Sequence, residues 1–203
     1  MEYPDTIRRA TPSDLPALSE TLADALQDDP VISWLFPSEH DRRQRAKRFF
    51  MWTLSRTSMP LGEVWMDEEC QAAALWAPPD RWRLSPRDQV GLLPSAAALF
   101  KGRTPRILVG FNKVEARHPK DPPHWYLYFI GTQTARQGHG FGGALLRHML
   151  ARCDEENLAR DGDLRPSPAP SPRRAKIGVE GTVRGRWRRC LFAPLGGSVF
   201  VRA

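Results

Sequence analysis

An apolar run, a cluster of glycines and an amphipathic segment follow one another between residues 124 and 153. Residues 124–132 are apolar on both faces, which is typical of a strand buried in a sheet. Residues 137–143 read Gln-Gly-His-Gly-Phe-Gly-Gly. Residues 144–153 then place apolar side chains at the spacing of one helix face, at Leu145, Leu146, Met149, Leu150 and Cys153. This order of strand, glycine turn and helix predicts an α/β fold.

The glycine turn is suited to binding a phosphate group. Glycine has no Cβ atom, so the backbone can approach a ligand closely. A helix that begins just after the turn presents unpaired N–H groups and roughly half a positive charge, which together favour a pyrophosphate. A tight turn that only starts the helix would use the same residues, so the interpretation depends on the surrounding sequence.

Three known motifs contain glycines in similar order. Gly138, Gly140 and Gly143 fit the dinucleotide fingerprint G-x-G-x-x-G, but other residues separate them from the strand, and the acids about 20 residues on do not follow a predicted strand. A P-loop is excluded because no Lys-Ser or Lys-Thr follows the glycines. The remaining pattern is Gln/Arg-x-x-Gly-x-Gly/Ala, which Gln137, Gly140 and Gly142 fill.

This pattern, after a strand that carries Ile130-Gly131-Thr132, resembles the acyl-CoA-binding motif of the GNAT acetyltransferases. The likeness extends upstream through residues 6–15, 28–34, 64–67, 72–79 and 120–127. Within the superfamily, the chain most resembles bacterial small-molecule acetyltransferases of the puromycin N-acetyltransferase type. The resemblance covers about residues 5–158 and favours the phosphate interpretation of the glycine turn.

The resemblance implies a mixed central sheet flanked by helices, and an N-acetyltransferase that moves an acetyl group from acetyl-CoA, as co-substrate, to the amine of a small molecule. It also implies that backbone groups of Ile130, Gly131 and Thr132 pair with the pantetheine arm like an added strand. The pyrophosphate would be held by the amides of Gln137, Gly138, His139, Gly140, Phe141, Gly142 and Gly143. A backbone N–H on the same strand would polarise the thioester carbonyl.

The candidate catalytic side chain is His124, because an imidazole titrates near physiological pH. The alternative is that His124 is an ordinary surface or core histidine with no catalytic role. The glutamate base of histone-type relatives corresponds here to Tyr126, and the tyrosine that acts as thiolate acid has no counterpart after Tyr128. Asp28 and Asp29 are candidates to line an amine site, although Asp-Asp-Pro is also typical of a cap and turn. A CoA-binding protein with little or no catalysis is therefore an alternative function.

Charge divides the chain into two parts. Residues 1–159 carry as many basic as acidic side chains, so residues 160–203 account for the whole net charge of +7. The sequence therefore predicts an acyl-CoA-binding domain over 1–159 and an Arg/Pro-rich tail over 160–203. Residues 164–174 are rich in Pro, Ser and Arg, a composition that favours extended or disordered backbone. The fifth strand and the following helix of the family are not found there, which would reduce activity.

Two explanations of the tail remain open. One is a shift of reading frame near residue 159 in a GC-rich gene, which would produce an Arg/Pro-rich sequence in place of the family's C-terminal part. The other is a C-terminus that has genuinely diverged from the family. A further alternative is a nucleic-acid-associated protein that binds through the basic tail, where residues 184–189 mix arginines with Trp187. A dedicated nucleic-acid binder usually carries its charge on the folded domain, so the position of the charge favours the acetyltransferase.

Other features narrow the class of protein. No apolar run approaches 20 residues and no basic-then-apolar leader occurs, so the sequence predicts no membrane partner and a cytoplasmic location. Cys70, Cys153 and Cys190 have no His at ligand spacing, which predicts free thiols and no metal. Several tryptophans are candidates for the pocket of a planar amine, although most are expected in the core: Trp34, Trp52, Trp65, Trp76, Trp82 and Trp125.

Periodicity and caps predict the remaining elements. Helices are expected over 14–26, 40–56, 85–100 and 104–116, and strands over 7–10, 62–67 and 70–77. Ser13 is expected to cap the first helix. By the family likeness, residues 28–34 form a loop.

Overall fold

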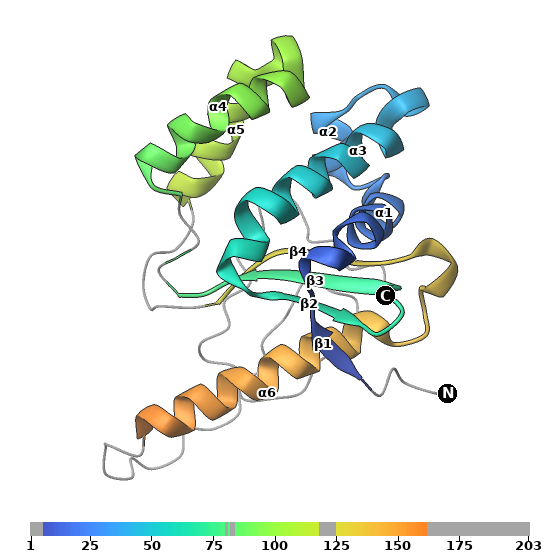
Figure 1. The fold of residues 1–203 in the computed structure, drawn as a ribbon, viewed down its shortest axis with the longest axis vertical. Coiled ribbons are helices and arrows are strands. Elements are labelled where there is room, and N and C mark those ends of the chain that lie inside the picture. Colours follow the sequence, from blue (N-terminus) through green and yellow to red (C-terminus); the bar gives the residue numbers. More distant parts are fainter. Residues whose placement is uncertain (1–5, 80, 82–83, 118–124, 162–203) are drawn as a thin grey trace.

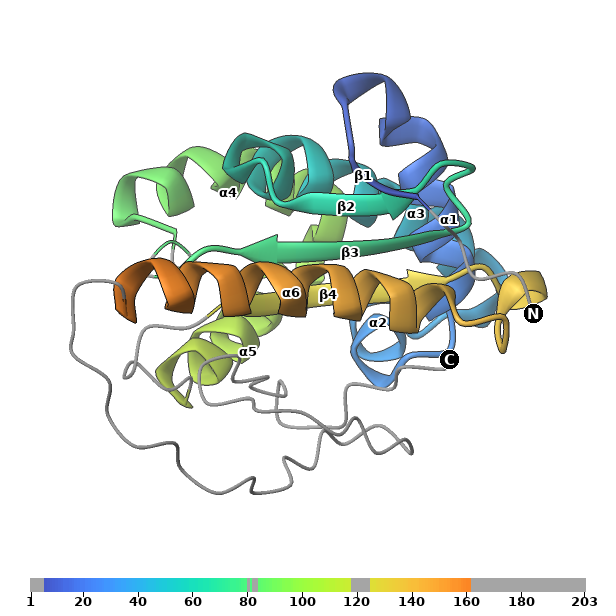
Figure 2. The same ribbon diagram turned by 90° about the horizontal axis from the view of Figure 1, so that it is seen from below.

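A computed structural model describes residues 6–79, 81, 84–117 and 125–161. They form a central sheet with helices on both faces, as Figures 1 and 2 show from two directions. The expected α/β fold is therefore confirmed. Within these residues, no helix has the length and apolar character needed to span a membrane.

The sheet has four strands in the described part of the chain. They lie side by side in sequence order: β1 (Ile7–Arg9), β2 (Val64–Asp67), β3 (Ala72–Ala77) and β4 (Tyr126–Thr132). Each strand is antiparallel to its neighbour. All six residues of β3 are buried, because this apolar strand lies inside the sheet with a packed layer on each face.

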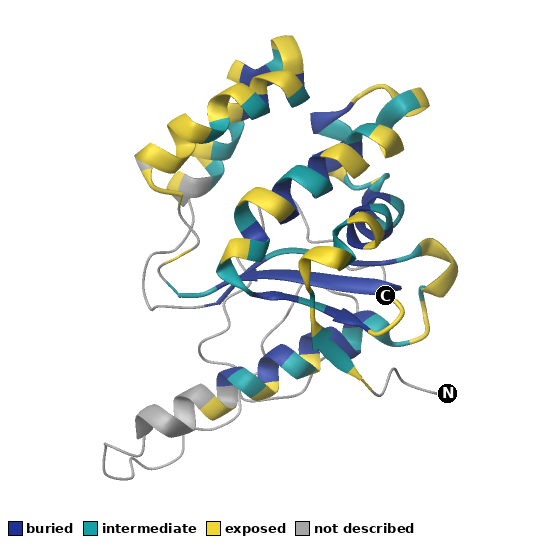
Figure 3. Ribbon diagram, in the orientation of Figure 1, coloured by how far each residue is buried: buried dark blue, intermediate teal, exposed yellow. Residues whose placement is uncertain are grey.

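The described residues form six α-helices: α1 (Leu15–Leu26), α2 (Pro30–Leu35), α3 (Glu39–Thr53), α4 (Pro86–Phe100), α5 (Thr104–Arg117) and α6 (Phe141–Asp161). Helices α1 and α3 lie over one face, α6 crosses the other, and the α4–α5 hairpin stands beside α3 (Figures 1 and 2). One core cluster joins the sheet to α1–α5 and includes Phe36, Phe49 and Phe50. A second core cluster, which we call the α6 cluster, joins the sheet to α6 and includes Trp76 and Met149. Buried residues lie on the strands and on the sides of the helices that face the sheet (Figure 3).

Three local predictions need correction. Residues 28–34 do not form a simple loop, because Asp29 accepts hydrogen bonds from the backbone N–H groups of Val31 and Ile32 and caps α2. The expected helix over 40–56 ends as an α-helix at Thr53 and continues as a π-helix, η2 (Leu54–Ser58). The helix after the glycines begins at Phe141 rather than at residue 144.

Ser13 does not cap α1. Instead, a short 3₁₀ helix, η1 (Pro12–Asp14), precedes it, and Asp14 forms a capping box with Thr11, whose backbone N–H donates to Asp14 Oδ2 at 2.8 Å. The Arg8 guanidinium donates to both Asp14 oxygens at 2.8 Å. The hydrogen bond from Arg8 is the main reason that the pKa of Asp14 lies well below its usual range.

Asp14→Asn is therefore expected to lower the free energy of unfolding by about 1 kcal/mol at pH 7, since the amide cannot pair with the Arg8 guanidinium. A depressed carboxyl pKa stabilises the fold above the pKa of the unfolded chain, about 3.9, and this stabilisation is lost as the pH falls below it. Denaturant unfolding should show a constant difference between pH 5 and pH 7 that shrinks below about pH 4. A difference that grows in acid would contradict this assignment.

Two cysteines lie in the described part of the chain. Cys70 and Cys153 are both buried. Burial raises the pKa of Cys70 to about 11, so its thiol is protonated at neutral pH. Cys190 lies outside the described residues, and within them no group of three His, Cys, Asp or Glu side chains is placed to hold a metal ion.

Candidate functional site

The backbone edge of β4 is the first part of the candidate site. β4 pairs with β3 along one edge, and no other strand of the described chain pairs with its second edge. The side chains of Ile130 and Thr132 are buried, and Ile130 packs in the α6 cluster. A Cβ atom at Gly131 would lie 2.8 Å from Ala25 Cβ on α1. Backbone groups of an antiparallel strand alternate between its two edges, and Gln133 N donates toward β3 while Thr132 O accepts from Gln137 on the other side. Ile130 and Thr132 therefore offer backbone groups, rather than side chains, to a ligand along the second edge.

A β-bulge interrupts β4 near its middle. Leu75 pairs with Phe129 and Trp76 pairs with Leu127, so Tyr128 is the extra residue of β4 between these two pairs. Bulges re-aim the strand and are frequent beside active sites. The sequence of β4 contains no glycine or proline at this position that would have indicated the bulge.

Several hydrogen bonds hold the connection between β4 and α6. The backbone N–H of Gln133 donates to Gln71 O at 2.8 Å, next to the turn between β2 and β3. The backbone N–H of Thr134 donates to the Asp24 carboxylate of α1 at 2.7 Å. The Gln137 side chain donates back to Thr132 O at 3.2 Å. The glycine turn is thus fixed to the end of β4 before the helix begins.

The turn has left-handed backbone at two of its glycines. Gly138 has φ +80° and Gly140 has φ +84°, in the left-handed region that residues with a Cβ atom avoid. A Cβ atom at Gly138 would meet no atom within 4 Å, so open space lies in front of this part of the turn. His139 is exposed, and its ring Nδ1 lies 2.9 Å from Gln137 O.

The start of α6 presents backbone donors to this open space. Its first i→i−4 hydrogen bond is from Ala144 N to Gly140 O at 2.9 Å, so the N–H groups of Phe141, Gly142 and Gly143 have no acceptor within the helix. No acidic residue occurs in its first turn. The preceding 3₁₀ helix, η5 (Thr134–Arg136), ends at a basic residue. These residues fit a di-anion, because the helix N-terminus supplies donors and positive potential with no competing carboxylate.

The predicted cofactor-binding residues come together in the fold, since the Gln137 hydrogen bond joins Ile130–Thr132 to the glycine turn. His124 lies outside the described residues. Tyr126 is buried, and burial raises its pKa to about 12, so the hydroxyl stays protonated at neutral pH and does not replace a carboxylate base. Asp29 is the cap of α2, and Asp28 lies 4.0 Å from Arg42.

The tryptophans that the structure describes lie in or beside the two core clusters. Trp76 and Trp125 belong to the α6 cluster. Trp34 and Trp52 are partly buried and pack against the other cluster, while Trp65 packs against α6 with its ring centroid 4.3 Å from that of His148. Trp82 lies outside the described residues. Trp52 faces a groove that sequence reasoning did not locate.

Comparison with known proteins gives consistent matches. A family profile described as acetyltransferase (GNAT) family matches residues 20–161. A crystal structure of a histone acetyltransferase HPA2 and related acetyltransferase from Corynebacterium glutamicum is 26% identical with a TM-score of 0.53, covering 72% of this chain and 70% of that chain. A mosquito arylalkylamine N-acetyltransferase like 5b is 13% identical with a TM-score of 0.42, covering 74% and 71%. The profile spans β2–β4 and the glycine turn.

Proposed function

The chain belongs to the acetyltransferase (GNAT) family, and from this premise we propose that it is an N-acetyltransferase that moves the acetyl group of acetyl-CoA to the amine of a small molecule. One observation carries the proposal. Gly138 and Gly140 place a left-handed turn between the donor-rich start of α6 and the edge of β4 that pairs with no other strand among the described residues. The likeness of residues 5–158 to enzymes of the puromycin N-acetyltransferase type supports a small amine as acceptor.

The chain would bind acetyl-CoA through backbone groups. The pyrophosphate would accept hydrogen bonds from the amides of residues 137–143, and the pantetheine arm would pair with Ile130–Thr132 along the free edge of β4. Because Gly131 packs directly on α1, this edge is held at a fixed distance from the helix. Acetyl-CoA supplies the activated acetyl group as a thioester.

Acyl transfer requires a neutral amine and a polarised carbonyl. The amine nitrogen bonds to the carbonyl carbon, the C–S bond breaks, the amine loses a proton and the thiolate gains one. We assign polarisation of the carbonyl to a backbone N–H at the Tyr128 bulge. The bulge supports this role because it changes the direction of the strand edge. His124 is the proposed proton acceptor, since Tyr126 stays protonated.

The organisation of the chain is part of the proposal. Residues 1–159 would form the acyl-CoA-binding domain, and residues 160–203 a separate basic tail. The tail lacks the family's tyrosine acid, so the leaving thiolate would take its proton from water and turnover would be slow. A CoA-binding protein with little catalysis and a nucleic-acid-associated protein are the alternatives.

One experiment separates these functions. Calorimetric titration with acetyl-CoA should give one site per chain, and thiol release with a panel of small amines should exceed hydrolysis without amine, at a low rate. Binding without amine-dependent thiol release would favour the non-catalytic alternative. Absence of acetyl-CoA binding by folded protein would contradict the acetyltransferase. In that case, salt-sensitive DNA binding that is lost on deletion of residues 160–203 would support the nucleic-acid alternative.

A further inference from the structure

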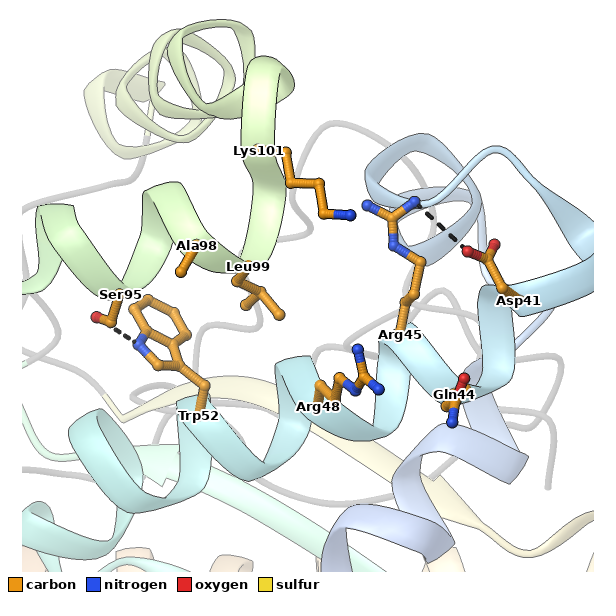
Figure 4. Close-up of a pocket in the computed structure, with 9 residues that line it drawn as sticks. All are labelled: Asp41, Gln44, Arg45, Arg48, Trp52, Ser95, Ala98, Leu99 and Lys101. Carbon is orange, nitrogen blue, oxygen red and sulfur yellow. Dashed lines mark hydrogen bonds and ion pairs between the residues drawn. The ribbon is translucent and has the colours of Figure 1, made fainter.

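A groove with a volume of about 380 Å³ lies between α3 and α4 (Figure 4). We call it the α3–α4 groove, and its principal lining residues are Arg45, Arg48, Trp52, Ala98, Leu99 and Lys101. It lies on the side of the sheet opposite α6 (Figure 1). None of its lining residues belongs to the glycine turn or to β4.

The charges along α3 are balanced on one side and unbalanced on the other. Toward α1, Glu20 pairs with Arg43 at 2.8 Å and with Lys47 at 2.6 Å. Toward α4, Arg48 and Lys101 have no ion pair within the described residues. The α3–α4 groove is therefore lined by two cations without an ion pair among the described residues.

The third cation of the groove is only loosely compensated. Arg45 lies 3.9 Å from Asp41, the one acidic residue in the groove lining. Its guanidinium lies over the Phe36 ring, 5.0 Å from the centroid, and the Lys101 side chain extends toward it from α4 (Figure 4). Like charges that face one space raise each other's electrostatic energy unless an anion lies between them.

The apolar wall of the groove is held in place by contacts between the two helices. The Trp52 indole N–H donates to Ser95 Oγ at 2.9 Å. The ring centroid of Trp52 lies 6.5 Å from that of Phe49 and 6.4 Å from that of Phe100. Leu99 lies beside Trp52 along the same wall (Figure 4). The wall therefore offers a preformed flat surface for an aromatic or alkyl group.

The backbone is irregular on both sides of the groove. Lys101 has φ 53° and ψ −136°, a conformation that costs a residue with a Cβ atom free energy. α3 changes to a π-helix at Leu54, two residues after Trp52. Such conformations cluster at ligand sites, and here they accompany the convergent charges.

We propose that the α3–α4 groove binds a small organic anion, a carboxylate or phosphate attached to a flat apolar body. The anionic group lies between Arg45, Arg48 and Lys101, and the apolar body lies against Trp52 and Leu99. The volume suits a small molecule rather than a polymer. This site is independent of the acetyl-CoA site, because the two share no residue.

Phenyl phosphate is a suitable probe, with benzyl alcohol as its uncharged counterpart. Calorimetry on the full chain should detect phenyl phosphate and give no measurable heat with benzyl alcohol. The double variant Arg48→Gln/Lys101→Gln should weaken phenyl phosphate at least about tenfold, because it removes two of the three cations. The matched control Arg56→Gln/Arg87→Gln removes two exposed charges outside the groove and should change the affinity less than about twofold.

The variants also separate this site from the glycine turn. Gly140→Asp should leave phenyl phosphate affinity unchanged, while Trp52→Ala should weaken it. Equal weakening by the two double variants would overturn the proposal in favour of unspecific attraction. Loss of binding in Gly140→Asp, with binding retained in Arg48→Gln/Lys101→Gln, would place the anion at the turn and would also overturn it. Circular dichroism and melting curves check that each variant is folded.

Discussion

Gly140→Asp is expected to weaken acetyl-CoA binding by at least about 100-fold. The new carboxylate would stand at the start of α6, where the pyrophosphate is proposed to bind, and two unit charges about 4 Å apart repel by several kcal/mol at a protein surface. A loss of about 3 kcal/mol corresponds to about 100-fold in affinity. Aspartate is among the few residues with a Cβ atom that tolerate left-handed backbone, so the protein should still fold at φ +84°. Calorimetric titration of the purified variant measures the effect.

Two control variants separate charge from shape. Gly140→Asn adds nearly the same volume without the charge and should retain clearly more affinity than Gly140→Asp. Gly91→Asp adds the same charge at an exposed position of α4, where a Cβ atom meets nothing within 4 Å, and should leave acetyl-CoA affinity unchanged. Unchanged affinity in folded Gly140→Asp would sink the assignment of the glycine turn.

Gly131→Val is expected to lower the free energy of unfolding by about 2–3 kcal/mol, as overpacked core substitutions do. A Cβ atom at this position lies 2.8 Å from Ala25 Cβ and 3.4 Å from Leu22 Cδ2, so α1 must move away from β4. The usual gain from replacing a strand glycine, under about 1 kcal/mol, is too small to offset this overlap. The melting temperature should fall by roughly 5–10 °C, measured by circular dichroism or calorimetry.

A double-mutant cycle tests the cause of this loss. Gly131→Ala should be less destabilising in an Ala25→Gly background, because the overlapping methyl group is then absent. Gly91→Ala on α4 should be neutral or stabilising, since that helical position is open. Equal costs of Gly131→Ala in both backgrounds would show that contact with α1 is not the reason for glycine in β4.

Local sequence was sufficient where neighbouring residues decide the structure. Gly138 and Gly140 adopt the left-handed backbone that glycine favours, so a turn could be predicted here from these residues alone. Most helices were predicted because their apolar spacing repeats over several turns. α2 was missed because six residues are too few for periodicity, although Asp29 as cap and Pro30 at the first helical position were available signals.

The start of α6 shows tertiary contacts overriding local preference. Glycine is a poor helix former, so Gly142 and Gly143 favoured a start at residue 144. In the fold, Phe141 packs against the α6 cluster beside the sheet, and the helix extends back to include both glycines. Packing of one helix face supplies more free energy than two glycines cost, which no local pattern could show.

What the sequence by itself determined about this protein is the family, the order of the main elements and the position of the glycine turn, because each depends on residues close together in the chain. Only the tertiary structure decided the Tyr128 bulge, the close approach of Gly131 to Ala25, and the convergence of cations on the α3–α4 groove. These features depend on distances between segments many residues apart. Such distances are decided by the packing of whole helices on the sheet, to which every core side chain contributes.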